Sequence, residues 1–197
     1  MEKELDFLIE WIPLDKKHFR ILTLVTVLAD NNRGFRGTIK EFCDELGIKN
    51  SAVNTKSIKE SIKHLADNDY LTITIDENIY NISLAAAAEK SKKIIKIKKA
   101  WYKMLREDAG ATTWENALKV LLRIMEQPQD TPITNEMLGE ETGLSKTTVE
   151  RCVKAICSKK DSDNLRLYKE TVTIKNEEGQ FVCLGQKYNW GYDWNWM

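Results

Sequence analysis

The feature that most constrains the fold of this chain is an apolar spacing that occurs twice. Four apolar positions, separated by four, three and two residues, recur 91 positions later in the 197-residue sequence. The two copies are Val53, Ile58, Ile62 and Leu65, then Leu144, Val149, Val153 and Ile156. A short helical pattern that ends in glycine, at Gly47 or Gly143, precedes each copy. A helix, a glycine turn and a second helix form a helix-turn-helix, so the sequence predicts two such units.

The first half of the chain predicts helices followed by a hairpin. The expected elements are a helix over 16–29, a short strand over 35–37, a helix from Thr38, a helix from Ser51 or Asn54 to Ala66, and strands over 71–75 and 79–84. Asp15 is a suitable N-cap for the first helix, and Thr38 with Glu41 forms a capping box for the second. The apolar segment 7–12 fits either a strand or a short helix.

The same order of elements recurs in the second half. The expected elements are a helix over 113–126, a helix from Thr134 to Gly143, a helix after Ser145, and strands over 166–175 and 180–187. Thr112 and Glu115 form a second capping box, and Met137 and Leu138 are expected to face the core. The chain should be mostly α with small β-hairpins, an α+β fold. Two winged helix-turn-helix domains in tandem, 1–88 and 111–197, would be joined by a basic connector helix over 89–110.

The run from Glu140 to Ile156, EETGLSKTTVERCVKAI, resembles a bacterial helix-turn-helix. Over residues 15–187 the layout is similar to tandem winged-helix DNA-binding proteins, including plasmid and phage replication initiators and DnaD-like replisome organisers. This resemblance implies a sequence-specific protein for double-stranded DNA, acting in transcription regulation or in replication initiation of a mobile element. Either both domains read successive major-groove segments, or one reads DNA while the other forms a homodimer.

The candidate DNA-binding residues lie where such domains meet a duplex. The N-terminal residues of a recognition helix meet base edges, and later basic residues and wing lysines meet phosphates. In the recognition helix of the first domain these residues are Asn54, Thr55, Lys56, Lys59 and Lys63. In the recognition helix of the second domain they are Lys146, Thr147, Thr148, Arg151 and Lys154, and in the hairpin wing of the second domain they are Lys169 and Lys175. The same polar residues would also suit the solvent-facing side of any helix.

Positive charge is concentrated between the two halves. Residues 1–88 carry 11 basic and 14 acidic side chains, residues 89–108 carry 8 and 3, and residues 109–197 carry 11 and 13. Five basic residues of the connector recur at helical spacing: Lys92, Lys96, Lys99, Lys103 and Arg106. This helix either packs on the domains with a solvated basic side, or follows the DNA backbone through Lys96, Lys99 and Lys103, or binds a lipid surface.

Aromatic residues alternate with polar residues at the C-terminus. Tyr188, Trp190, Tyr192, Trp194 and Trp196 recur with a period of two, which predicts a strand with one aromatic face. That face would cover the protein's own core, exchange strands in a homodimer, or dock on a partner's sheet edge through Trp190, Tyr192, Trp194 and Trp196. Stacking on single-stranded bases is a further alternative.

The sequence contains no pattern that predicts catalysis, a cofactor or a metal. It has no glycine-rich phosphate loop, its two histidines, His18 and His64, form no His-x-His pair, and Cys152 and Cys157 lack zinc-ligand spacing. No apolar run spans a bilayer, and scattered cysteines favour a reducing, cytoplasmic setting. We expect a non-enzymatic DNA-binding protein with no small-molecule substrate. A protein-interaction scaffold that uses the winged surfaces and the aromatic strand is the alternative.

Overall fold

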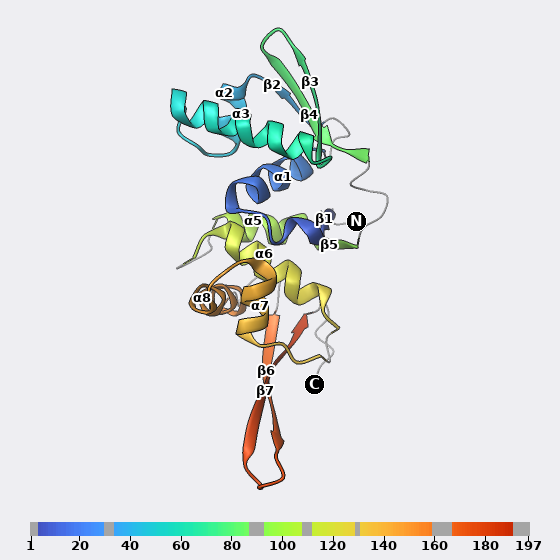
Figure 1. The fold of residues 1–197 in the computed structure, drawn as a ribbon, viewed down its shortest axis with the longest axis vertical. Coiled ribbons are helices and arrows are strands. Elements are labelled where there is room, and N and C mark those ends of the chain that lie inside the picture. Colours follow the sequence, from blue (N-terminus) through green and yellow to red (C-terminus); the bar gives the residue numbers. More distant parts are fainter. Residues whose placement is uncertain are drawn as a thin grey trace. The chain divides into compact units, whose positions relative to one another are not determined.

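The computed structural model describes residues 4–29, 34–86, 93–107, 112–128, 131–158 and 167–190. These residues form an α+β fold with two compact units (Figure 1). The N-terminal unit is Glu4–Lys96, and the C-terminal unit includes the described residues from Ile97 onward.

Three helices build the N-terminal unit: α1 (Lys16–Ala29), α2 (Ile39–Glu45) and α3 (Ala52–Asp67). The expected caps of α1 and α2 are confirmed, and of the two expected starts of α3 the structure selects Ser51. The Asp15 carboxylate accepts hydrogen bonds from the backbone N–H of Lys17 and His18, at 2.8 and 3.0 Å. Thr38 and Glu41 form the capping box, and Ser51 caps α3. These side chains satisfy amide groups that have no partner within the helix, which explains why the helices begin there.

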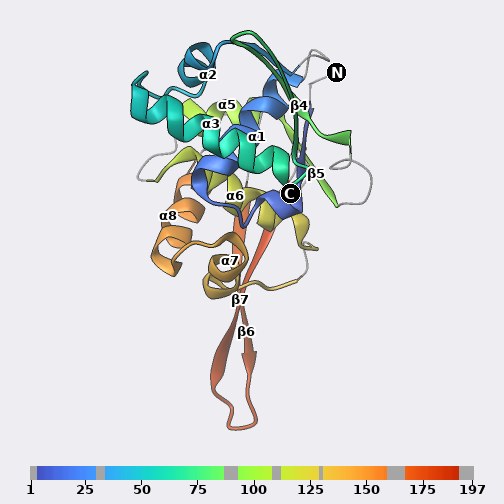
Figure 2. The ribbon, with the colours of Figure 1, turned by 45° about the horizontal axis from the view of Figure 1, so that its top comes forward.

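A three-stranded antiparallel sheet completes this unit (Figure 2). Its strand order is β2 (Phe35–Gly37), β4 (Ile79–Leu84) and β3 (Leu71–Asp76), so the short strand pairs with the far strand of the hairpin. Phe35 lies opposite Ile82, and Ile82 lies opposite Ile73. Ile82 is buried together with Phe42, Ile58 and Leu65, so the sheet closes the core that the helices form.

The apolar segment at the N-terminus uses both of its expected conformations. β1 (Glu4–Leu8) is a strand, and a 3-10 turn, η1 (Ile9–Trp11), follows directly. β1 pairs with β5 (Ile94–Lys98), whose first three residues belong to the same unit. The Ile9 N–H donates to the carbonyl of Lys93 at 3.2 Å and extends this pairing.

The prediction that the connector is a single helix is therefore wrong. Its first half is the strand β5, and only its second half is helical, as α5 (Lys99–Glu107). Ile95 and Ile97 are buried and Ile94 is 41% exposed, which is the period of a strand. Three isoleucines within four residues favour a strand, and pairing with β1 overrides the helical spacing of Ile94, Ile97 and Trp101.

The C-terminal unit packs α5 with α6 (Trp114–Glu126), α7 (Asn135–Thr142) and α8 (Lys146–Cys157). The caps at Thr134 and Ser145 are confirmed, since each side chain accepts from the backbone N–H three residues later. The capping box at Thr112 is wrong: Thr113 is the N-cap, without a side-chain bond, and the Thr112 hydroxyl lies 3.3 Å from Cys152 Sγ. Met137, expected inside, is 44% exposed, whereas Leu138 is buried.

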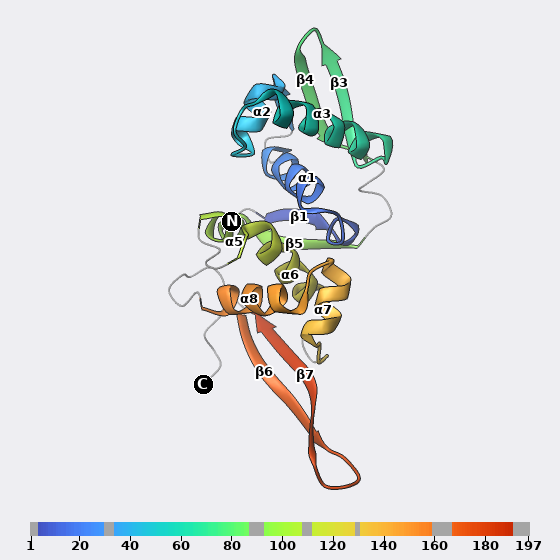
Figure 3. The ribbon, with the colours of Figure 1, turned by 60° about the vertical axis from the view of Figure 1, so that its left-hand side comes forward.

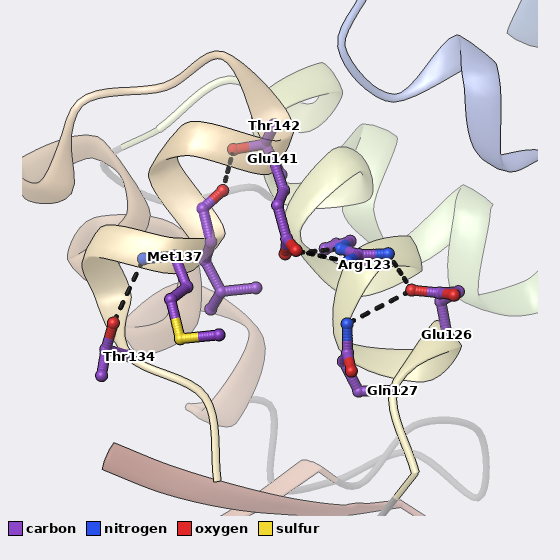
Figure 4. Close-up of polar contacts among 8 residues, drawn as sticks. Arg123, Glu126, Gln127, Thr134, Met137, Glu141 and Thr142 are labelled. Carbon is purple, nitrogen blue, oxygen red and sulfur yellow. Dashed lines mark hydrogen bonds and ion pairs between the residues drawn. The ribbon is translucent and has the colours of Figure 1, made fainter. Parts of the chain in front are cut away.

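Arg123 holds α6 against α7. Its Nε and Nη2 donate to the two carboxylate oxygens of Glu141, at 2.6 and 2.5 Å, and its Nη1 donates to Glu126 (Figure 4). Glu126 also accepts from Gln127 at 3.3 Å. The Arg123 side chain is 15% exposed, so this forked ion pair is largely shielded from water.

A long hairpin follows α8. β6 (Leu167–Lys175) and β7 (Phe181–Trp190) pair antiparallel around the turn 176–180 and extend away from α6, α7 and α8 (Figure 3). A bulge interrupts the ladder between Val172 and Thr173. There Gly185 has φ +138, and a Cβ on it would lie 2.9 Å from the carbonyl oxygen of Ile133. Backbone bonds between Ile133 and Gln186 tie the base of the hairpin to the segment before α7.

Candidate nucleic-acid interface

Each unit contains two helices joined by a turn of the same geometry. Gly47 and Gly143 end α2 and α7 with φ of +65° and +70°. The next residue closes the turn: Ile48 N–H donates to the Cys43 carbonyl at 2.8 Å, and Leu144 N–H donates to the Gly139 carbonyl at 2.9 Å. A bond across five residues with a left-handed residue between them is a Schellman C-cap. Both units thus redirect the chain in the same way before the next helix.

The turn geometry corrects the apolar repeat. Ile48, not Val53, stands where Leu144 stands, because each directly follows the left-handed glycine. The turn before α3 is two residues longer, since Ser51 caps four residues after Gly47 and Ser145 caps two residues after Gly143. Val53 therefore falls inside the first turn of α3, where it is 76% exposed. Of the other seven repeat positions, six are buried as expected and Leu144 is half-buried.

Two contacts fix α3 on α1. The Lys17 ammonium donates to the Ser57 hydroxyl at 2.6 Å, and the rings of His18 and His64 stack with centroids 4.8 Å apart. Below them Ile58, Ile62 and Leu65 are buried. Three apolar residues and two polar contacts on one side leave the opposite side of α3 facing solvent.

Three lysines lie on that exposed side of α3. Lys56, Lys59 and Lys63 are all exposed. Lys56 Nζ lies 3.9 Å from Glu60 Oε1, and both side chains are more than half exposed, so water screens this pair. Lys59 Nζ lies 5.9 Å from the ring centroid of Tyr80 on β4. All three ammonium groups can reach a phosphate backbone without losing a buried partner.

Asn54 and Thr55, the expected base readers of α3, each donate one side-chain hydrogen bond within the protein. The Asn54 side-chain amide donates to the Lys49 carbonyl at 2.7 Å, and the Thr55 hydroxyl lies 3.4 Å from Asn50 Oδ1. Both side chains are half-buried. They hold the long turn before α3, and these bonds restrict how far the two side chains can extend toward a base.

The exposed side of α8 carries Thr147, Arg151 and Lys154, together with Glu150. Two other expected readers are occupied. The Thr148 hydroxyl shares a 2.9 Å hydrogen bond with the capping hydroxyl of Ser145. Lys146 Nζ pairs with Glu136 on α7, and this bond raises the pKa of Lys146 and lowers that of Glu136. Arg151 and Lys154 are thus the exposed basic side chains of α8 that are most accessible to a DNA phosphate or base.

The connector lysines do not share one helix. Lys96 lies on β5, with its Nζ 3.9 Å from Asp6 Oδ1 on β1, whereas Lys99 and Lys103 lie on α5. Lys103 is exposed and Lys99 is half-buried. Lys92 lies outside the described residues. The basic stripe expected from helical spacing is therefore broken at the junction of β5 and α5.

The wing lysines have unexpected neighbours. Lys169 is exposed on β6, and Lys175 Nζ lies 5.5 Å from the ring centroid of Phe181. Glu177 and Glu178, both exposed, form the tip of the turn that follows. Apolar side chains dominate the far end of the hairpin: Ile174, Phe181, Val182 and Leu184 are 42–73% exposed. An acidic tip disfavours contact with phosphates, so this hairpin is a poorer DNA element than its lysines suggest.

Only the start of the aromatic tail can be compared with expectation. β7 includes Tyr188 and Trp190, and Tyr188 is buried, which raises the pKa of its hydroxyl. Tyr192, Trp194, Trp196 and the side chain of Trp190 lie outside the described residues. The first residue of the alternating run therefore covers the protein's own core.

No protein-family model matches the chain, and searches of curated proteins and of solved structures also find no match. Within the described ranges, no cluster of three or more His, Cys, Asp or Glu side chains could hold a metal ion. The helices of those ranges are too short or too polar to cross a membrane. The geometry of the two helix pairs is thus the basis for any proposal about function.

Proposed function

We propose that this chain is a sequence-specific binding protein for double-stranded DNA, built from two winged helix-turn-helix units in tandem. In each unit a left-handed glycine ends one helix, and the next helix buries its apolar side. The single observation that carries the proposal is the charge of the opposite side. This side exposes five basic residues, Lys56, Lys59 and Lys63 on α3 and Arg151 and Lys154 on α8, beside two acidic ones, Glu60 and Glu150.

The physical fit is that of an α-helix in a major groove. An α-helix fits into the major groove of B-DNA, and the residues of its first turns meet the base edges. Basic residues further along meet phosphates and release counterions, which makes affinity salt-dependent. Thr147 and Arg151 are the exposed reader candidates of α8. Arg151 suits a guanine edge or a phosphate, because its guanidinium donates two parallel hydrogen bonds.

The experiment that tests this proposal is selection from random duplexes, followed by a salt titration on the selected site. We expect an enriched motif and a linear fall of log affinity with log salt, by about 0.9 for each phosphate neutralised. Directly repeated sites would favour replication initiation of a mobile element. A palindrome would favour transcription regulation by a homodimer. No enriched motif and no salt dependence would overturn the proposal.

One observation favours a second function, that of a non-enzymatic protein-interaction scaffold. The far end of β6–β7 exposes Ile174, Phe181, Val182 and Leu184 beside an acidic turn. Ile174 and Val182 lie opposite each other on the two strands, and exposed apolar patches mark sites of protein interaction. A tight protein partner combined with no DNA affinity would identify this function. If Phe181→Ser and Val182→Ser abolish binding of the protein partner but leave DNA binding unchanged, the hairpin serves the protein partner and not the duplex.

A further inference from the structure

The longer turn before α3 leaves one apolar side chain unusually exposed. Val53 is 76% exposed, more than the other large apolar residues of the described chain. It is the second residue of α3, after the N-cap Ser51 and Ala52. A β-branched side chain loses rotamer freedom in a helix, and at this exposure Val53 gains little from packing. Its position suits neither helix propensity nor the core.

The neighbours of Val53 differ in what they can offer to a ligand. Asn54 donates one amide hydrogen to the Lys49 carbonyl, and the Thr55 hydroxyl donates to Asn50 Oδ1, so both side chains are tied to the preceding turn. Residues 53, 56, 60 and 63 follow helical spacing and lie along one side of α3, where all four are exposed. The first turn of this stripe therefore offers two methyl groups. The turns behind it offer Lys56 and Lys63 together with Glu60, whose Oε1 lies 3.9 Å from Lys56 Nζ.

This combination matches one feature of duplex DNA. In the major groove thymine alone among the four bases presents a methyl group, and apolar side chains recognise it by contact. The lysines of the same stripe complement the phosphates on either side of the groove. Beside Val53 the stripe carries two lysines and one glutamate, Glu60, so its net charge is positive and favours the duplex over a partner protein.

We propose that Val53 contacts the 5-methyl group of a thymine and makes one position of the DNA site specific for a T·A pair. The inference rests on the proposed DNA-binding function and deepens it for α3. It moves the base-reading role from Asn54 and Thr55, which are half-buried and bonded to the preceding turn, to the exposed valine that precedes them. Lys56 and Lys63 keep the phosphate-contacting role.

The test removes the methyl group from each side of the contact. In the selected duplex each thymine is replaced in turn by deoxyuridine, which lacks only the 5-methyl group. At one position we expect the affinity of the unaltered protein to fall about three- to fivefold, the value of one buried methyl-sized group. Val53→Ala should lower affinity for the thymine duplex by a similar factor and should no longer distinguish thymine from deoxyuridine there.

Val182→Ala is the matched control, because it makes the same change at a side chain 42% exposed on the C-terminal unit. It should retain the discrimination between thymine and deoxyuridine. Because Val53 is exposed and β-branched, Val53→Ala should not lower the melting temperature, and circular dichroism checks this.

The outcomes separate the two proposals. Specific DNA binding in which Val53→Ala discriminates as the unaltered protein does, or in which deoxyuridine is tolerated at every position, would overturn the inference and leave the proposed function intact. A change in oligomeric state of Val53→Ala with unchanged DNA affinity would overturn it too, and would assign Val53 to a protein contact. Absence of specific binding by the unaltered protein would overturn both.

Discussion

The Arg123 guanidinium and the Glu141 carboxylate form a two-pronged ion pair between α6 and α7, with N–O distances of 2.6 and 2.5 Å. The two side chains are 15% and 33% exposed. Because α8 packs on both helices, this pair fixes the platform from which α8 presents Thr147, Arg151 and Lys154.

Arg123→Met should therefore destabilise the C-terminal unit. The substitution leaves Glu126 and Glu141 without their shared cation in a partly dehydrated site, at a cost of about 1–3 kcal/mol in the free energy of unfolding. Urea denaturation measures this, with Arg151→Met as the control for an exposed arginine. Equal stability of both variants would show that the pair is no stronger than a surface ion pair.

Gly139→Ala should weaken the turn between α7 and α8. An added Cβ would lie 2.7 Å from the carbonyl oxygen of Leu144, and backbone atoms cannot yield as a flexible side chain can. We expect a loss of about 1–3 kcal/mol in unfolding free energy, the usual cost of overpacking. The matched variant is Glu140→Ala, an exposed neighbour on the same helix, which should change the unfolding free energy by less than about 0.5 kcal/mol. A stable Gly139→Ala would mean that α7 moves away from the turn without penalty.

The stability of the N-terminal unit should fall as the pH drops below about 6.5. Burial lowers the pKa of His18 from its ordinary value of 6.5, and the stacked His64 lowers it further, although Asp15 opposes this. In that pH range the unfolded chain binds more protons at His18 than the folded chain does, so acid favours unfolding. Thermal melting between pH 7.5 and 5.5 measures the slope. His18→Gln should flatten it, and an unchanged slope in that variant would contradict the assignment to His18.

Glu136→Gln should strengthen DNA binding. Glu136 holds the Lys146 ammonium, and removing its charge frees that cation at the start of α8. We expect about a two- to fivefold gain in affinity at low salt, the scale of an exposed ion pair. The gain should shrink as salt is added. Glu140→Gln removes an equivalent charge from an exposed position of α7 and measures the general charge effect. An equal gain in that variant would show that Lys146 is not the cause.

Arg151→Ala should weaken specific DNA binding while leaving the fold intact, since Arg151 is exposed on α8. Loss of one base contact costs about 1–3 kcal/mol and relaxes specificity at one position. Lys154→Ala should instead lower the salt slope by about 0.9 and affect all sequences alike, as expected for a phosphate contact. Competition binding with site variants distinguishes these two patterns. Undiminished specificity in Arg151→Ala would show that another residue of α8 reads the bases.

The sequence by itself determined the features whose chemistry lies within a few residues. Thr38 with Glu41 and Ser145 with Thr148 begin helices because a side-chain oxygen accepts from an amide three residues on. Gly47 and Gly143 end helices because glycine adopts the left-handed conformation without steric cost. Hairpins 71–84 and 167–190 follow from alternating residues around short polar turns.

Only the tertiary structure decided which partner each segment meets. Residues 94–98 fit both a helix and a strand, and pairing with β1 selected the strand. Val53 fits the apolar repeat, but two extra turn residues placed it in the first exposed turn of α3. Asn54, Thr55 and Lys146 have the composition of DNA readers, yet groups from the preceding turn or from α7 engage them. The periodicity of apolar residues depends only on their spacing along the chain, whereas contacts between distant segments decide which side of a helix or strand is buried.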